Sequence, residues 1–328
     1  MLQKMLVCAG LVVVVSFAMN MKTASAYDRP PQKPAIVLAA FGTTQVEAVE
    51  SIINIVNRVK GAFPEYDVHL AFTSNIIRSI WRERADDADF RRENPGIPAE
   101  VYDVKSALAT LADIQDKGAR LILVQSLHVT DGEEYEDLAN LVKMLEGYET
   151  MKRALHPFPW IGVGEPALGV GDGPDKYLER AVKAIKPLAD EAKAAGAALV
   201  LMGHGNEHLN QNVFAKLEKK LRDAYGPQVY IGTVEAPPFA EEIVEAMKES
   251  NAPRKALLAP LMVVAGDHAV NDMAGDEDDS WASVFKAEGI AVETHLKGLG
   301  SNDSWADIYV EHLKVLEKSV LEKKAKDE

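Results

Sequence analysis

Three side chains that can bind a divalent cation follow strand-like segments in the second half of the chain. His204 lies in LMGHGNEH, Glu235 in GTVEAPP and His268 in AGDHAVNDM. Open α/β sheets bind ligands at the carboxyl ends of their strands, which is where these residues fall. Two imidazoles and one carboxylate could hold a metal ion and leave coordination positions open for exchange. The carboxylate could instead accept protons from a substrate.

The neighbours of these residues favour a ligand site. Glycines on both sides of His204 would let a ligand approach the end of the strand closely. Asp267 and Asp272 could orient the His268 ring through its second nitrogen, as carboxylates do for histidine ligands of metals. Taken alone, Glu235 is also typical of the first turn of a helix, where the helix dipole favours a carboxylate.

Strand-like apolar runs alternate with amphipathic helical stretches, which predicts an α/β fold with parallel sheets flanked by helices. The predicted strands are 35–42, 68–74, 120–127 and 160–164 in the first half, and 198–205, 229–236, 255–262 and 291–298 in the second. The two halves align in order and chemistry, through duplication or through chance similarity of two such lobes. The first-half counterparts of the three candidate ligands are about Phe41, Thr73 and Glu133, so only the second half carries the metal-binding set.

The pattern divides the chain into a signal segment and two Rossmann-like lobes. Residues 1–26 combine Lys4, an apolar run and a small-residue cleavage site, which predicts a secretory signal peptide and an exported, periplasmic protein. The apolar run is shorter than the roughly 20 residues that a membrane-spanning helix needs. We predict an N-terminal lobe over 27–165, a glycine- and proline-rich linker over 166–175 and a C-terminal lobe over 176–328. The linker lacks the GxxxxGK[ST] pattern of a nucleotide-binding loop.

Composition narrows the possible partners. The formal charge of −14 argues against a general nucleic-acid or anionic-membrane binder. The only cysteine, Cys8, lies in the predicted signal peptide. Any metal must therefore be held by imidazole and carboxylate groups, a set that suits cobalt, iron, nickel or zinc.

Several of these segments resemble a known family. AAFGTT, LVQSLHVTDGEEYEDL, LMGHGNEH, GTVEAPP and PLMVVAGDHAVNDMAGDEDDSW are similar to the anaerobic-type sirohydrochlorin cobaltochelatases of the CbiK family, over residues 35–315. The resemblance implies the class II chelatase fold, which ferrochelatases share, with a cleft between two lobes and no use of ATP. It implies insertion of Co²⁺, and often Fe²⁺, into sirohydrochlorin by a homo-oligomer. His204 and His268 match the two metal-binding histidines of the family, and Glu235 matches the acidic residue of its cleft.

The resemblance gives further residues a possible role. The substrate carries many carboxylates, so Arg78 and Arg82 could bind it beside Trp81, or they could lie on a solvent-facing helix. His128 is either a hydrogen-bonded structural histidine or an axial ligand for haem or for a tetrapyrrole held between subunits. His208 could support the site if a helix begins near His204.

Two other functions fit the same features. An exported binding or carrier protein for metal or tetrapyrrole would also have two lobes and a signal peptide, but it would not catalyse insertion. A metal-dependent hydrolase would need a tightly held metal with an activated water. The predicted export departs from the family, because cobalamin synthesis is cytoplasmic, so the native metal and tetrapyrrole stay open.

Overall fold

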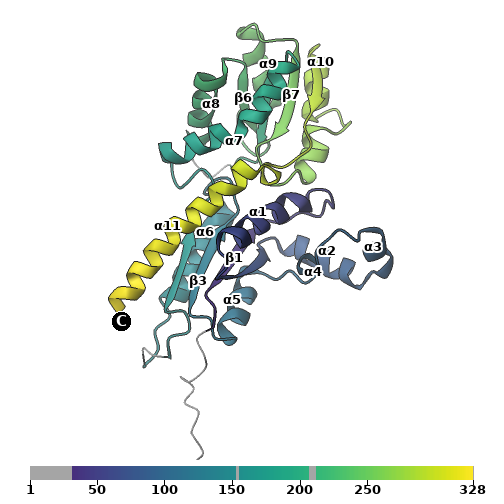
Figure 1. The fold of residues 1–328 in the computed structure, drawn as a ribbon. Helices are drawn as coiled ribbons and strands as arrows, with labels where there is room; N and C mark the ends of the chain where they lie inside the picture. The colour runs from purple at the N-terminus through teal and green to yellow at the C-terminus, as the bar shows by residue number, and fades with distance from the viewer. Residues whose placement is uncertain (1–31, 153–154, 207–211, 328) are drawn as a thin grey trace, which may run out of the picture. The chain divides into compact units, whose positions relative to one another are not determined.

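The chain folds around two four-stranded parallel sheets. The computed structural model describes residues 32–152, 155–206 and 212–327, so the predicted signal peptide and His208 lie outside the described residues. The strand orders are β2-β1-β3-β4 and β6-β5-β7-β8, so the two sheets have the same topology. Figure 1 shows the two sheets and their helices. The predicted α/β class with two similar lobes is confirmed.

All eight predicted strands are present, and several end a few residues early because the chain leaves the sheet there. The first sheet contains β1 Ala35–Ala40, β2 Asp67–Phe72, β3 Leu121–Ser126 and β4 Trp160–Gly164. The second contains β5 Ala198–Gly203, β6 Val229–Thr233, β7 Lys255–Pro260 and β8 Ala291–Thr294.

Helices connect the strands, as parallel sheets require. Those between β1 and β4 are α1 Val49–Ala62, α2 Asn75–Asp86, α3 Ala88–Glu93, α4 Ala99–Tyr102, α5 Ala107–Asp116 and α6 Glu133–Glu146. Those that follow are α7 Asp175–Ala194, α8 Asn212–Tyr225, α9 Ala240–Glu249, α10 Trp281–Ala287 and α11 Asp303–Asp327, with a π-helical turn η2 at Ala269–Met273 and a 3₁₀ turn η3 at Leu299–Ser301.

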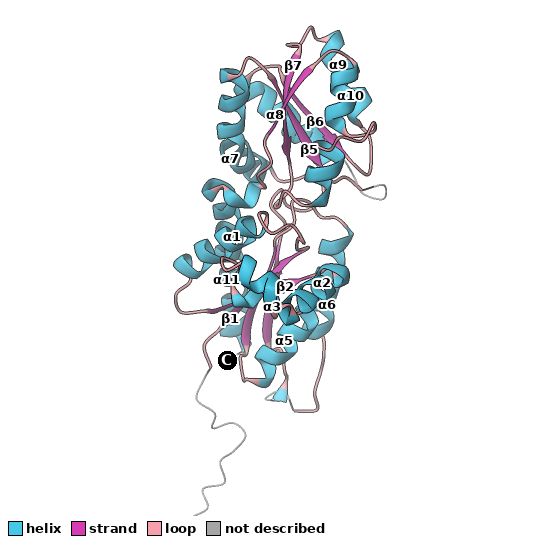
Figure 2. Cartoon of the chain, turned by 90° about the vertical axis from the view of Figure 1, so that its right-hand side faces the viewer, coloured by secondary structure: helices cyan, strands magenta, loops and turns pink. Residues whose placement is uncertain are grey.

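Each sheet is covered on both faces, which explains why its central strands are continuously apolar. In β1 the alternate residues Ile36 and Leu38 pack toward α1 and α11, whereas Val37 and Ala39 pack toward α5 and α6. The second sheet packs against α7 and α8 on one face and against α9 and α10 on the other. Figure 2 shows these helices flanking the strands.

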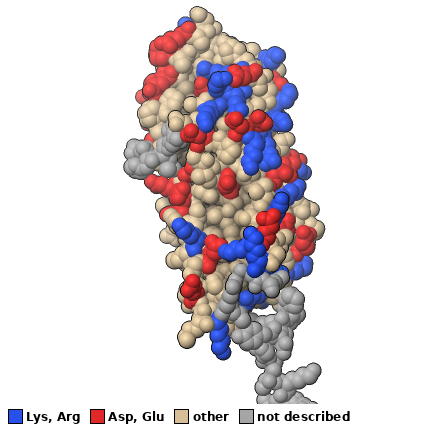
Figure 3. All heavy atoms as spheres, turned by 90° about the vertical axis from the view of Figure 1, so that its left-hand side faces the viewer, with Lys and Arg blue, Asp and Glu red and all other residues tan. Residues whose placement is uncertain are grey.

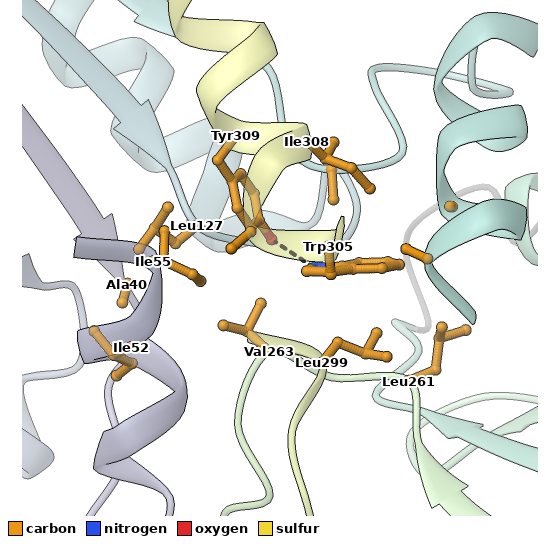
Figure 4. Close-up of a cluster of buried hydrophobic side chains, with 14 of the residues drawn as sticks. Ala40, Ile52, Ile55, Leu127, Leu261, Val263, Leu299, Trp305, Ile308 and Tyr309 are labelled. Carbon is orange, nitrogen blue, oxygen red and sulfur yellow. Dashed lines mark hydrogen bonds between the residues drawn. The ribbon is translucent and has the colours of Figure 1, made fainter. Parts of the chain in front are cut away.

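Helix α11 joins the two halves of the chain. It follows β8 in sequence, yet it contacts α1, β3 and β4 of the first half as well as α7. Its residues Trp305 and Tyr309 are fully buried. Figure 4 shows them among Leu127 of the first half and Leu261 and Val263 of the second. A single apolar cluster thus contains residues from the carboxyl ends of both sheets.

Polar contacts reinforce this junction. Arg58 of α1 makes a bidentate ion pair with Asp307 of α11, with Nη2 to Oδ1 and Oδ2 distances of 2.6 Å. Asn54 donates from Nδ2 to the carbonyl oxygen of Gly300 at 3.0 Å. Bidentate geometry adds direction to an ion pair, so these contacts fix the position of α11 along α1.

Charged side chains cover much of the surface. Figure 3 shows basic and acidic residues interspersed on one face of the molecule. Many pair along single helices, such as Lys186 with Asp190 at 2.5 Å and Lys219 with Asp223 at 2.7 Å. Exposed pairs of this kind contribute little, because water and salt screen them, so the apolar clusters dominate stability. No described helix is both long and apolar enough to span a membrane.

A buried histidine lies where α11 meets the segment after β4. The His312 side chain is 3% exposed, and its Nδ1–H donates to the carbonyl oxygen of Glu165 at 3.0 Å. The ring packs against Tyr177 with ring centroids 4.2 Å apart. Burial lowers the pKa of His312 to about 4. The native state therefore holds this ring neutral.

We predict that His312 destabilises the protein in mild acid. Its pKa falls from 6.5 when unfolded to about 4 when folded, so its contribution is complete above pH 6.5 and declines as the pH falls toward 4. The loss should approach about 3 kcal/mol of unfolding free energy. The variant His312→Asn can keep the hydrogen bond to Glu165. Between pH 6.5 and 4 its free energy of unfolding, measured in urea, should fall by less than that of the parent. A variant with the same pH dependence as the parent would show that His312 is not the responsible group.

Candidate functional site

The structure brings together the three residues that the sequence proposed as ligands. One possible ligand atom from each of His204, Glu235 and His268 lies within 4.8 Å of the other two. The two imidazole rings meet edge to face, with centroids 4.9 Å apart and an interplanar angle of 82°. A metal at usual bond lengths of about 2.1 Å needs ligand atoms no more than about 4.2 Å apart, so small side-chain rotations would close the set around an ion.

Loops after three neighbouring strands supply these residues. His204 directly follows β5, and Glu235 lies in the loop after β6. The carbonyl oxygen of His204 accepts hydrogen bonds from the backbone N–H groups of Val234 at 3.1 Å and Glu235 at 2.8 Å. His268 comes after β7, at the start of the π-helical turn η2. The parallel order β6-β5-β7 therefore places all three loops at one edge of the sheet.

Both histidines present the same nitrogen for coordination. The Nδ1–H of His268 donates to the carboxylate of Asp272 at 2.6 Å, as the sequence predicted. The Nδ1–H of His204 donates to the carbonyl oxygen of Gly205 at 2.9 Å. Each bond assigns the proton to Nδ1 and leaves the lone pair of Nε2 for a metal.

Gly205 has two reasons to be glycine. Its φ of +81° lies in the left-handed region. A Cβ atom at this position would also lie 2.5 Å from Oγ1 of Thr233. That hydroxyl donates to the carbonyl oxygen of Ala236 and so holds the loop that carries Glu235. The second glycine of the GHG segment thus allows the loops after β5 and β6 to pack closely.

A cavity of about 430 Å³ lies beside the histidines. Its lining draws on both halves of the chain. The wall from the first half includes Phe41, Ile76, Ile80, Leu127, His128 and Glu134, and the wall from the second half includes His204, Met262, Val264, Asp267 and His268. Most of this lining is apolar, with a few polar groups, as in sites for small organic ligands.

The comparisons with known proteins decide the family. The family model described as "Cobalt chelatase (CbiK)" matches residues 34–317. The chain belongs to the cobalt chelatase (CbiK) family. This confirms the resemblance seen in the sequence.

Relatives support the same assignment. The "Sirohydrochlorin cobaltochelatase" of Salmonella typhimurium is 30% identical over 282 residues, which cover 86% of this chain and 95% of that protein. The "Sirohydrochlorin cobaltochelatase CbiKC" of Nitratidesulfovibrio vulgaris is 30% identical over 285 residues, which cover 87% of this chain and 90% of that protein.

A solved chelatase has the same fold. The sirohydrochlorin chelatase SirB of Bacillus subtilis subspecies spizizenii, in complex with cobalt, has a TM-score of 0.52 at 12% identity. The match covers 87% of this chain and 95% of that chain. The predicted chelatase fold is therefore confirmed.

The cavity contains an acidic residue that sequence reasoning missed. Glu134 lines the first-half wall at the start of α6. The sequence alignment of the halves had placed Glu133 opposite His268, one residue away. In the structure Glu133 is exposed and is absent from the lining, whereas Glu134 is half-buried. Glu134 follows the observed end of β3 by as many residues as His268 follows the observed end of β7, so the one-residue error came from strand ends that only the structure located.

His128 lines the same wall but is poorly placed to ligate iron. Burial lowers its pKa to about 4, so the ring is neutral. Oγ of Ser126 accepts the backbone N–H of His128 at 3.3 Å and lies 2.8 Å from its Nδ1. Nδ1 is thus occupied by the Ser126 hydroxyl. Nε2 is also enclosed, with no partner among the described residues. The predicted haem site does not fit a ring whose Nδ1 is bonded to Ser126 and whose Nε2 is enclosed.

Arg78 and Arg82 do not reach the cavity. Nη1 of Arg78 donates to the carbonyl oxygens of Phe72 at 2.5 Å and Thr73 at 2.7 Å, at the end of β2. Arg82 is exposed and donates from Nε to the carbonyl oxygen of Arg78. Trp81 is fully buried, so its ring offers no surface for a ligand. The arginines therefore stabilise helix α2 and its connection to β2.

We predict that Asp272→Asn weakens Co²⁺ binding by about 10- to 100-fold, because the carboxylate orients His268 and raises its basicity. Spectroscopic titration of the full chain with Co²⁺ would measure this. Asp276→Asn is the matched control, since it removes the same charge from an exposed residue nearby. Equal losses of Co²⁺ affinity in both variants would show that the change in net charge, and not the contact with His268, weakens binding.

Proposed function

We propose that this protein inserts Co²⁺ into sirohydrochlorin without ATP. The observation that carries the proposal is the group of His204, Glu235 and His268, which lies beside an apolar cavity in a member of the cobalt chelatase family. The relatives named above are sirohydrochlorin cobaltochelatases, and the chain covers at least nine-tenths of their length.

The ligand set suits a metal ion that is bound only transiently and then transferred to the tetrapyrrole. Imidazole nitrogens bind Co²⁺ well, and only three protein ligands converge, so other positions stay open for water or for the pyrrole nitrogens. Two of the ligands are exposed and His268 is half-buried, which gives the ion access from solvent. Pyrrole nitrogens can then replace water on the ion before the histidines release it.

Insertion also requires the loss of two pyrrole protons. Glu134 and Asp267 are the carboxylates among the described residues of the cavity lining, and Glu235 lies beside the two histidines. His128 is poorly suited to this role, because burial lowers its pKa to about 4 and makes the ring a weak base. We assign proton acceptance to Glu134 on the wall opposite the metal, so that Glu235 is free to hold the ion.

Three further features belong to the same proposal. The imidazole and carboxylate donors would also bind Fe²⁺, which stands below Co²⁺ in the usual order of affinity. The composition of residues 1–26 supports export to the periplasm. The family resemblance supports a homo-oligomer. Haem is not included, because the geometry of His128 does not fit it.

The central prediction is catalytic turnover. The absorption spectrum of anaerobic sirohydrochlorin with Co²⁺ should change with multiple turnovers in the presence of the full chain. His204→Ala and His268→Ala should bring the rate down toward that of a blank without enzyme, because each removes a metal ligand. Binding of both substrates by the parent without turnover would support a carrier instead. Metal that survives extensive dialysis would support a hydrolase.

A second prediction separates proton transfer from metal binding. Glu134→Gln should lower kcat by about 100-fold, a common size for the loss of a general base, and leave Co²⁺ affinity unchanged. Glu133→Gln is the matched control, since it changes the adjacent exposed carboxylate. If both variants keep the parental kcat, Glu134 does not accept the protons.

A further inference from the structure

An apolar patch lies on the cavity wall contributed by the first half. It consists of Phe41, Ile76 and Ile80, all of which line the cavity. Phe41 is 47% exposed and Ile76 is 72% exposed. A single exposed apolar side chain is common, but a contiguous group beside a cavity indicates a binding surface.

Helix α2 presents two neighbouring apolar rows to the protein, and Ile77 of the buried row also touches the cavity. Ile77 and Trp81, one turn apart, are buried and anchor the helix to the core. Ile76 and Ile80, also one turn apart, both line the cavity. Burial of Ile77 and Trp81 holds α2 on the core, and this role does not explain why Ile76 is exposed.

Phe41 occupies the position that a metal ligand occupies in the other half. It directly follows β1, as His204 directly follows β5, and the two sheets have the same strand order. The two halves thus present opposite chemistry at matching positions. One contributes a metal ligand and the other contributes an aromatic side chain.

The cavity offers few cationic groups that could pair with a polyanionic substrate. Among the described residues, its lining contains no lysine or arginine. Its charged groups include the carboxylates of Glu134 and Asp267. The whole chain carries a formal charge of −14. Carboxylates at the rim of a macrocycle would therefore be better solvated by water than by this cavity.

We propose that Phe41, Ile76 and Ile80 bind one face of the tetrapyrrole ring, while its carboxylates stay in solvent. This rests on the proposed function and names the surface that selects the organic substrate. The ring face then lies against the first half, and the metal approaches from His204 and His268 of the second half. Binding energy comes from removing apolar surface from water, so salt should not weaken it.

The test replaces Ile76 with glutamine in the full chain. Ile76→Gln should raise KM for sirohydrochlorin by about three- to tenfold, the order expected when partial burial of a large aliphatic side chain is lost. The affinity of the chain for Co²⁺ alone should not change. In the parent, KM should stay constant or fall from low to high salt, because salt screens repulsion between the protein and the substrate.

Leu108→Gln is a matched control. Leu108 is 51% exposed and is the second residue of α5, as Ile76 is of α2, and both helices begin after a serine that caps them. Leu108 does not line the cavity. Its substitution should leave KM unchanged.

The outcomes separate the two proposals. If the parent catalyses insertion and Ile76→Gln has the same KM as Leu108→Gln, the proposal that the apolar patch binds the ring is wrong, whereas the chelatase function stands. A parental KM that rises steeply with salt would also overturn it, because that dependence indicates charge pairing. A parent that binds Co²⁺ but never metallates the ring would overturn the proposed function and the patch with it.

Discussion

The apolar cluster around Trp305 and Tyr309 determines how the site is assembled. It joins the carboxyl end of β1 and the residues after β3 and β7, so loops of both sheets meet around one packed core. The hydroxyl of Tyr309 also donates to the carbonyl oxygen of His128 at 3.1 Å. Packed cores resist deformation, so the width of the cavity is fixed largely by these side chains. The cavity and the core share Leu127, Leu261 and Val263.

Two sheets of identical topology carry different chemistry at their carboxyl ends. The second sheet supplies two histidines and a glutamate at one edge, whereas the first supplies an apolar patch and Glu134. A reaction that joins a metal ion to an organic ring needs both surfaces at once. This asymmetry supports the proposal that each half binds one of the two substrates.

Hydrogen bonds set the state of each histidine near the cavity. Acceptors on Nδ1 of His204 and His268 leave Nε2 unprotonated and able to coordinate. At His128, Nδ1 lies 2.8 Å from the Ser126 hydroxyl and Nε2 is enclosed, so neither nitrogen is open for coordination. The same residue type is thus open for coordination in one half and closed to it in the other, because of its neighbours.

The sequence by itself determined the eight strands, the repeated topology and the convergence of His204, Glu235 and His268. Continuous apolar runs mark buried parallel strands, and residues that follow adjacent strands of such a sheet must converge at one edge. The sequence could not determine that α11 packs across the first sheet, that Arg78 caps β2, or that Glu134 rather than Glu133 lines the cavity. Those facts depend on contacts between residues far apart in the chain and on the direction of single side chains. Local patterns of hydrophobicity and charge do not specify either, so only the tertiary structure decided them.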